Sequence, residues 1–188
     1  LEVSHQKNPP PQKYGIIVLD LDETLFHTEQ TKIYWRPYLK KFLLYISKYF
    51  YLVIYTAALK LYADNILIKL FTKVIIKQLF VLKLYRNSVT SEGKDLTIVL
   101  KKLIEKNSYN KIPSKLLYKK KNNKILLNYN NIILIDNLVE NFLDTQLYNG
   151  IPIIDYYKNK NDTALILLIK FFKYYIIEKK KNATLTLK

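Results

Sequence analysis

Two aspartates one residue apart, Asp20 and Asp22, directly follow a run of four aliphatic residues from Ile16 to Leu19. A continuous β-branched and leucine run of this kind is typical of a strand buried on both faces of an α/β sheet. Such sheets carry their chemistry just beyond the carboxyl ends of the strands. A buried carboxylate is costly there unless a cation pairs with it, and two neighbouring carboxylates strengthen that need. The pair therefore predicts a catalytic edge with a hard, oxygen-binding cation such as Mg²⁺.

A purely structural alternative places Asp20 and Asp22 in a solvated turn, with Thr24 as a helix cap. A turn requires neither a buried strand in front of it nor both acids in this order before a threonine and a leucine. We therefore favour the catalytic interpretation.

Hydrophobic periodicity predicts the elements that position this pair. A helix is expected after Pro37, which is well placed in a first turn. A buried strand at 51–55 ends beside Thr56, whose hydroxyl can donate to a phosphate oxygen. A helix over 58–70 and a third strand over 79–85 follow.

Further along, an apolar stripe from Leu96 to Ile104 predicts a helix that starts just after Lys94. A strand at 132–135 places Asp136 and Asn137 at another carboxyl end, and a last helix begins near Asp162, a plausible cap. This alternation favours a three-layer α/β fold with a central parallel sheet and right-handed crossovers. The polar strand ends then converge on one rim.

The motif Asp20-Leu21-Asp22-Glu23-Thr24 resembles the D-x-D-x-[T/V] signature of the haloacid dehalogenase superfamily of phosphotransferases. The segment 21–28 looks like its small C-terminal-domain phosphatases, also called NLI-interacting-factor-like phosphatases. Similar landmarks recur in the family's order over about residues 14–177: Arg36-Pro37, Thr56, Tyr62-Ala63-Asp64, Lys94-Asp95-Leu96, Asp136-Asn137, Asn149-Gly150 and Asp162-Thr163.

The resemblance implies a haloacid dehalogenase-like fold with little or no cap, and a Mg²⁺-dependent phosphatase acting on phosphoserine or phosphothreonine in proteins, typically in the RNA polymerase II tail. At matching positions, Asp20 is the nucleophile that forms an aspartyl-phosphate. Asp22 is the general acid, which then serves as base for the attacking water.

The same resemblance assigns supporting roles. Thr56 and Lys94 hold phosphate oxygens, while Asp20, the backbone carbonyl of Asp22 and Asn137 hold the metal. Asp136 orients Lys94 or a metal-bound water, and Thr24 fixes the turn.

Length and composition limit the number of domains and the class of protein. The chain has 188 residues, 49% of them hydrophobic, which suits one sizeable core. We expect a flexible polar lead-in over 1–12, a phosphatase domain over 13–178 and a basic tail over 179–188. The apolar stretch 164–177 is interrupted by lysines and is shorter than the roughly 20 residues of a membrane span, and no signal peptide is visible.

The absence of cysteine excludes disulfides, thiolate zinc sites and the cysteine-dependent phosphatase mechanism. With only two histidines, a phosphohistidine intermediate, a histidine-rich metal centre and a Ser/His/Asp triad are all disfavoured. The aspartate nucleophile remains as the credible catalytic group.

The net charge of +16 suggests an anionic partner, and much of it lies in a Lys/Asn-rich insertion at about 105–131. The default interpretation of this insertion is a solvated low-complexity loop. The alternative is electrostatic docking of an anionic partner, nucleic acid being compatible with the charge but not required by it. A basic surface also steers a phosphorylated peptide toward the site.

Departures from the family concern recognition more than catalysis. Only about ten residues separate Thr24 from Arg36, so the peptide-reading pocket is expected to be reduced. Arg86 is open to a substrate contact or a structural ion pair. Two other functions stay open: a non-catalytic relative similar to an import-translocase receptor, and a phosphatase for small molecules or nucleic-acid ends.

Overall fold

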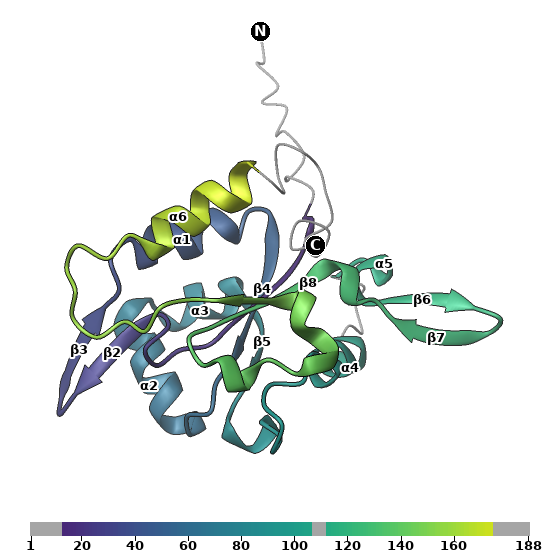
Figure 1. Ribbon diagram of the computed structural model, residues 1–188, viewed down its shortest axis with the longest axis horizontal. Helices are drawn as coiled ribbons and strands as arrows, with labels where there is room; N and C mark the ends of the chain where they lie inside the picture. The colour runs from purple at the N-terminus through teal and green to yellow at the C-terminus, as the bar shows by residue number, and fades with distance from the viewer. Residues whose placement is uncertain (1–12, 107–111, 175–188) are drawn as a thin grey trace, which may run out of the picture.

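A five-stranded parallel sheet in the order β5-β4-β1-β8-β9 forms the centre of the protein (Figure 1). The computed structural model describes residues 13–106 and 112–174, so the predicted lead-in and basic tail lie outside the described residues. The strands are β1 (Gly15–Leu19), β4 (Phe50–Tyr55), β5 (Phe80–Leu84), β8 (Ile132–Asp136) and β9 (Gly150–Pro152).

Helices cover both faces of this sheet, which confirms the predicted three-layer α/β fold. The side chains of Ile17 and Leu19 pack into one core with α1 (Leu39–Ile46), α2 (Lys60–Leu70), α3 (Lys73–Leu79) and α6 (Ala164–Phe171). Those of Ile16 and Val18 point to the other face, toward α4 (Leu96–Lys106) and α5 (Ser114–Leu117). A strand buried on both faces reads as a continuous aliphatic run because neither set of alternate side chains meets water.

The register of the central strand brings the polar strand ends together. Leu19 of β1 lies opposite Ile54 of β4 and Ile135 of β8. Because all three strands run in the same direction, Asp20, Thr56 and Asp136 emerge at one edge of the sheet. Parallel pairing thus converts three distant sequence segments into neighbours.

Two features of this half of the chain were not predicted. Helix α3 begins after Thr72, whose hydroxyl accepts a hydrogen bond from the backbone N–H of Ile75 at 3.4 Å. A hairpin of β2 (Phe26–Glu29) and β3 (Lys32–Trp35) fills the short stretch after the aspartate motif. The rings of Phe26 and Trp35, which lie opposite each other on the two strands, make an edge-to-face contact with centroids 5.6 Å apart.

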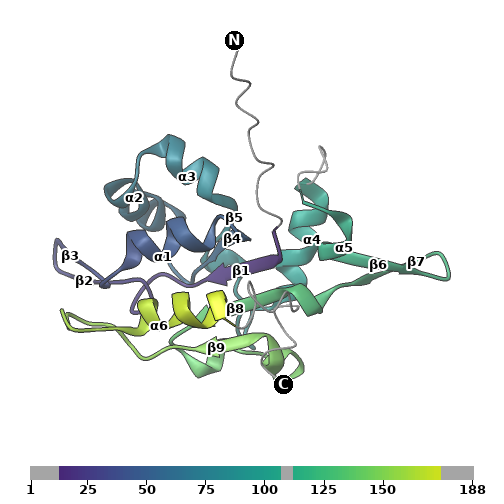
Figure 2. The ribbon, with the colours of Figure 1, turned by 90° about the horizontal axis from the view of Figure 1, so that it is seen from above.

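The interpretation of the Lys/Asn-rich insertion as a solvated loop is wrong for residues 118–127, which form an antiparallel hairpin. Its strands are β6 (Tyr118–Lys121) and β7 (Lys124–Leu127), joined by a turn at Asn122 and Asn123. This hairpin extends away from the body of the protein at the end opposite to β2 and β3 (Figures 1 and 2). Within the described ranges, no helix combines the length and apolar character that a membrane span requires.

Asp64 of α2 ties this helix to β5. Its carboxylate accepts hydrogen bonds from the Tyr85 hydroxyl at 2.8 Å, the Lys60 ammonium at 2.8 Å and the Lys83 ammonium. Burial alone raises the pKa of the Asp64 carboxyl, but these three donors hold it below its ordinary value. The landmark Tyr62-Ala63-Asp64 therefore contains a residue that connects elements of the fold.

We expect Asp64→Asn to lower the free energy of unfolding by about 1–2 kcal/mol at pH 7, because charge-assisted hydrogen bonds become neutral ones. A carboxyl whose folded-state pKa is depressed contributes stability above its unfolded pKa of about 4 and loses it as the pH falls further. Urea unfolding at pH 7 and pH 3 measures this, with the exposed Glu92→Gln as control. A difference that stays constant down to pH 3 contradicts the prediction.

Candidate active site

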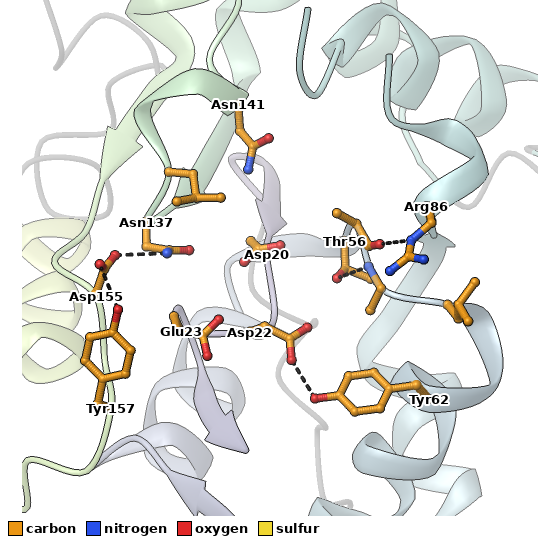
Figure 3. Close-up of a pocket in the computed structure, with 14 residues that line it drawn as sticks. Asp20, Asp22, Glu23, Thr56, Tyr62, Arg86, Asn137, Asn141, Asp155 and Tyr157 are labelled. Atoms are coloured by element: carbon orange, nitrogen blue, oxygen red, sulfur yellow. Dashed lines mark hydrogen bonds between the residues drawn. The ribbon is translucent and has the colours of Figure 1, made fainter. Parts of the chain in front are cut away.

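The carboxyl edge of the sheet opens into a cavity of about 630 Å³ (Figure 3). Asp20, Asp22, Thr56 and Asn137 line it, so four of the predicted site residues share one space. Lys94 and Asp136 are fully buried beside Asp20. Thr24, the remaining predicted residue, does not line the cavity but is buried and bonded to Asn137. Segments more than 100 residues apart in sequence thus meet around one cavity, as the parallel topology requires.

Lys94 forms the buried base of the site. Its ammonium donates hydrogen bonds to one oxygen of Asp20 and, at 2.6 Å, to one oxygen of Asp136. The other Asp136 oxygen accepts from the backbone N–H of Leu138 and the side-chain amide of Asn141, both at 2.9 Å. The structure therefore shows Lys94 held by two carboxylates, while its contact with phosphate stays a prediction.

The buried environment of Asp20 changes the acidity of its carboxyl group. Burial raises the pKa of the Asp20 carboxyl to about 7, an effect that Lys94 opposes and Asp136 reinforces. One Asp20 oxygen is committed to Lys94, which leaves the second oxygen for a ligand in the cavity.

Asp22 is held from a different side of the cavity. The Tyr62 hydroxyl of α2 donates to Asp22 Oδ1 at 2.6 Å, and the Thr28 hydroxyl of β2 lies 2.9 Å from the Tyr62 oxygen. Burial raises the pKa of the Asp22 carboxyl, although the hydrogen bond from Tyr62 works against that shift. A carboxyl with a raised pKa is better suited to donate a proton near neutral pH.

Thr24 connects the aspartate motif to the end of β8. Its buried hydroxyl donates to Asn137 Oδ1 at 2.8 Å and accepts from the Asn137 backbone N–H at 3.1 Å. The alternative of a solvated turn with Thr24 as helix cap is therefore wrong, because Thr24 is inaccessible and bonds to a distant strand end. The Asn137 amide nitrogen donates to Asp155 at 2.9 Å, which orients the amide between Asp155 and Asp20 (Figure 3).

Thr56 and Arg86 lie on the opposite wall. The Thr56 oxygen accepts from the backbone N–H of Ala58 at 3.1 Å, so its hydroxyl proton is available to a ligand. Arg86 Nε donates to the backbone carbonyl of Ala57 at 2.7 Å, and its guanidinium borders the cavity. In the described part of the chain Arg86 forms no ion pair, and its contact with substrate stays a prediction.

Arg36 stabilises the turn of the aspartate motif through hydrogen bonds. Its buried guanidinium binds both carboxylate oxygens of Asp162, at 2.9 and 2.8 Å. It also donates to the backbone carbonyls of Thr24 at 2.9 Å and Ile154 at 2.8 Å. Asp162 in turn accepts from the Ala164 N–H at 3.0 Å. The prediction of Asp162 as the cap is wrong by one residue, because the N-cap of α6 is Thr163. The bidentate pair thus fixes the motif turn against the segment that leads into the last helix.

The comparisons with known proteins identify the family. The family model described as NLI interacting factor-like phosphatase matches residues 15–184. The chain belongs to this family. The match includes every residue that the sequence resemblance placed in the site, and the resemblance itself is confirmed.

Curated relatives are similar over most of this chain. CTD small phosphatase-like protein 3 of Caenorhabditis elegans is 29% identical, and the alignment covers 84% of this chain and 53% of that protein. Nuclear envelope morphology protein 1 of Saccharomyces cerevisiae is 28% identical, with 85% of this chain and 42% of that protein covered. The chain spans about half the length, or less, of the curated relatives it matches.

A solved structure supports the fold. The fission yeast RNA polymerase II CTD phosphatase Fcp1, bound to beryllium fluoride, aligns with a TM-score of 0.50 and 16% sequence identity. The alignment covers 92% of this chain and 50% of that one. The expected haloacid dehalogenase-like fold is thereby confirmed.

The donor chemistry of the cavity fits the Mg²⁺ that the family implies. Asp20, Asp22 and Asn137 line the cavity. The ligands that the family resemblance assigns to the metal at these residues are all oxygens: a carboxylate oxygen of Asp20, the backbone carbonyl of Asp22 and the amide oxygen of Asn137. No cluster of three His, Cys, Asp or Glu side chains that could hold a metal occurs among the described residues. Few protein oxygens, with water supplying the rest, suit Mg²⁺ better than zinc, which prefers nitrogen and sulfur.

Sequence reasoning did not assign Tyr62 or Asp155 to the site. Tyr62 belongs to a landmark that the family resemblance had already marked, so a signal was present without a role. Asp155 stands alone in a loop after β9, and no local pattern could have placed it beside Asn137.

Proposed function

We propose that the protein is a Mg²⁺-dependent phosphatase for phosphoserine or phosphothreonine in proteins, acting through an aspartyl-phosphate. The observation that carries the proposal is the arrangement of Asp20 and Asp22 in one cavity, with one Asp20 oxygen bonded to the buried Lys94. The names of the relatives and of Fcp1 make the RNA polymerase II tail a substrate to test.

In the first step, the oxygen of Asp20 that does not contact Lys94 attacks phosphorus, while the bond from phosphorus to the serine oxygen breaks. Asp22 gives its proton to that leaving oxygen. Thr56 donates a hydrogen bond to a phosphate oxygen, and Arg86 supplies positive charge at the cavity wall. Asp20, Asn137 and the Asp22 carbonyl would hold Mg²⁺, which would supply positive charge to offset the repulsion between nucleophile and phosphate.

In the second step, water attacks the phosphorus of the aspartyl-phosphate. Asp22, now a carboxylate, takes a proton from that water, and the bond between phosphorus and Asp20 breaks. Inorganic phosphate leaves and both aspartates return to their starting states. Tyr62 acts as a positioning residue for Asp22, because its hydrogen bond directs one carboxylate oxygen and leaves the other toward the cavity.

The proposal is tested by hydrolysis of p-nitrophenyl phosphate with Mg²⁺, with EDTA, and with Mg²⁺ restored in excess. We expect turnover with Mg²⁺, its loss in EDTA and its recovery on restoration, because the charge on nucleophile and phosphate must be neutralised. Turnover that survives EDTA contradicts the metal-dependent mechanism, and no turnover in the intact protein favours the receptor-like, non-catalytic alternative.

A substrate panel then separates the remaining classes. Phosphoserine and phosphothreonine peptides, including repeats of the polymerase tail, are compared with phosphosugars and nucleotides by phosphate release. We expect the highest kcat/KM on peptides, because the cavity is open and the short β2–β3 hairpin leaves room for an extended chain. A preference for nucleotides or sugars contradicts the protein-substrate proposal while leaving the aspartate mechanism intact.

A further inference from the structure

The β6–β7 hairpin is an ordered arm with a fixed base. Its turn residues Asn122 and Asn123 have φ angles of 48° and 58°, the left-handed pair that favours a tight two-residue turn. At its base, the Asn128 N–H donates to the Leu117 carbonyl at 2.9 Å and the Asn128 amide donates to the Lys115 carbonyl at 2.6 Å. Leu117 itself is fully buried against the core, so the arm is anchored in the fold.

The arm carries only positive charge. From residue 112 to residue 135 the sequence contains no Asp or Glu, whereas five lysines lie there: Lys115, Lys119, Lys120, Lys121 and Lys124. All five are exposed, and none forms an ion pair with a described residue. The positive charge of this arm is therefore exposed to solvent and is not neutralised by a described acidic side chain.

The arm is remote from the cavity. It leads into the amino end of β8, whereas the cavity lies at the carboxyl end of the same strand. Figures 1 and 2 both show it extending from the end of the molecule opposite to β2 and β3. Its lysines therefore cannot contact a phosphoryl group bound at Asp20.

Each face of the arm combines an ammonium with an aliphatic side chain. Lys120 lies opposite Ile125 on one face, and Lys119 lies opposite Leu126 on the other. Ile125 and Leu126 are 58% and 48% exposed. Among the described residues the two strands pair only with each other, so both outer edges present backbone groups without a strand partner there.

We propose that the β6–β7 hairpin is a docking arm for an acidic, extended segment of a protein partner, which adds as a third strand along β6. The three consecutive lysines of β6 present positive charge on both faces of that edge, so carboxylates on either side of an added strand find a partner. Lysines at an edge also oppose pairing between two copies of this basic chain, which selects for a partner of opposite charge.

Other anionic partners fit the arm less well. Nucleic-acid binding typically uses arginine and exposed aromatic rings, whereas the hairpin has no arginine and its one aromatic ring, that of Tyr118, is partly buried against the core. A membrane surface favours one continuous apolar face, whereas Ile125 and Leu126 point to opposite faces and the tip is Asn122-Asn123.

The test uses a fluorescein-labelled peptide of alternating Glu and Val, titrated with the full chain by fluorescence anisotropy. Lys119→Glu/Lys120→Glu/Lys121→Glu is expected to weaken binding by about 10-fold or more, since three attractive charges become repulsive. The matched control Lys69→Glu/Lys73→Glu/Lys77→Glu makes the same charge change on exposed positions of α2 and α3 and is expected to stay within about 2-fold.

Strand addition is tested separately from charge. In a two-residue hairpin, hydrogen-bonded and non-hydrogen-bonded pairs alternate from the turn, so the Lys120 N–H points outward. Lys120→Pro removes that donor and Lys120→Ala retains it, while both lose the same charge. We expect the proline variant to bind the peptide about 5-fold more weakly than the alanine variant, and circular dichroism checks that both are folded.

The outcomes are distinguishable from those of the proposed function. Hydrolysis of p-nitrophenyl phosphate is expected to be unchanged in every arm variant, because the arm does not reach the cavity. Equal peptide binding by the triple variant and its control overturns the docking arm. Binding that depends on the arm for single-stranded DNA or phosphatidylserine vesicles, but not for the peptide, overturns the choice of partner. Equal binding by the proline and alanine variants overturns strand addition.

Discussion

Asp20→Asn is expected to lower kcat/KM for p-nitrophenyl phosphate by about 10³-fold or more. An amide oxygen is a poor nucleophile toward phosphorus, and the substitution also removes the negative charge that attracts Mg²⁺. The exposed Asp144→Asn, which removes the same charge far from the cavity, is the matched control and is expected to retain activity.

The loss in Asp20→Asn is expected to be chemical and not structural. Lys94 keeps its hydrogen bond to Asp136 in this variant, so no buried charge is left alone. A thermal melt close to that of the unmodified chain, together with lost turnover, supports the nucleophile. Turnover within about 10-fold of the unmodified protein shows that another group attacks phosphorus.

Lys94→Met is expected to cost about 3–5 kcal/mol of unfolding free energy, because two buried carboxylates lose the cation between them. For a chain of this size the melting temperature falls by about 6–20 °C. Calorimetry or urea unfolding measures the effect, with the exposed Lys69→Met as control. A cost below about 1 kcal/mol contradicts the role of Lys94 as the buried base of the site.

The loss of stability in Lys94→Met is expected to depend on pH in a definite direction. Without Lys94, burial and the neighbouring Asp136 carboxylate raise the pKa of the Asp20 carboxyl further, so the folded state retains a proton that the unfolded state releases. Stability present at low pH is then lost as the pH rises through the raised pKa of Asp20. We expect the deficit to be larger at pH 8 than at pH 5. Adding Asp136→Asn is expected to recover part of it, since one uncompensated charge is removed.

The site also explains why the motif has its spacing. Asp20 faces Lys94 and Asp136, whereas Asp22 faces Tyr62, so the intervening Leu21 separates two different environments. Both acids still border the same cavity. The chain turns as it leaves the strand. Two carboxyls separated by one residue can therefore approach one ligand from two directions.

The local features that the sequence determined are those with a short-range physical cause. The aliphatic run of β1 predicts burial on both faces, and the helical stripes predict α1, α2, α4 and α6, because each depends on which side chains avoid water. The order of motifs was sufficient to predict the family, and it selected residues that the structure brings to one cavity.

Tertiary structure alone decided the partners of those residues. Nothing near Arg36 in sequence predicts its bidentate pair with Asp162, and nothing near Asp155 predicts its bond to Asn137. Such contacts join segments separated by loops, so no local periodicity encodes them. The same holds for Lys94, whose full burial follows from the packing around β1 and β8 and not from its own neighbours.

The Lys/Asn-rich insertion shows most clearly how far composition alone can predict structure. Its composition is that of a solvated loop, yet residues 118–121 and 124–127 pair as strands because an Asn-Asn turn reverses the chain and Leu116 and Leu117 anchor its base. The amino-acid composition of a segment indicates whether it can be exposed to solvent. Whether that segment also acquires a shape depends on the turn geometry and on the core to which its ends are attached.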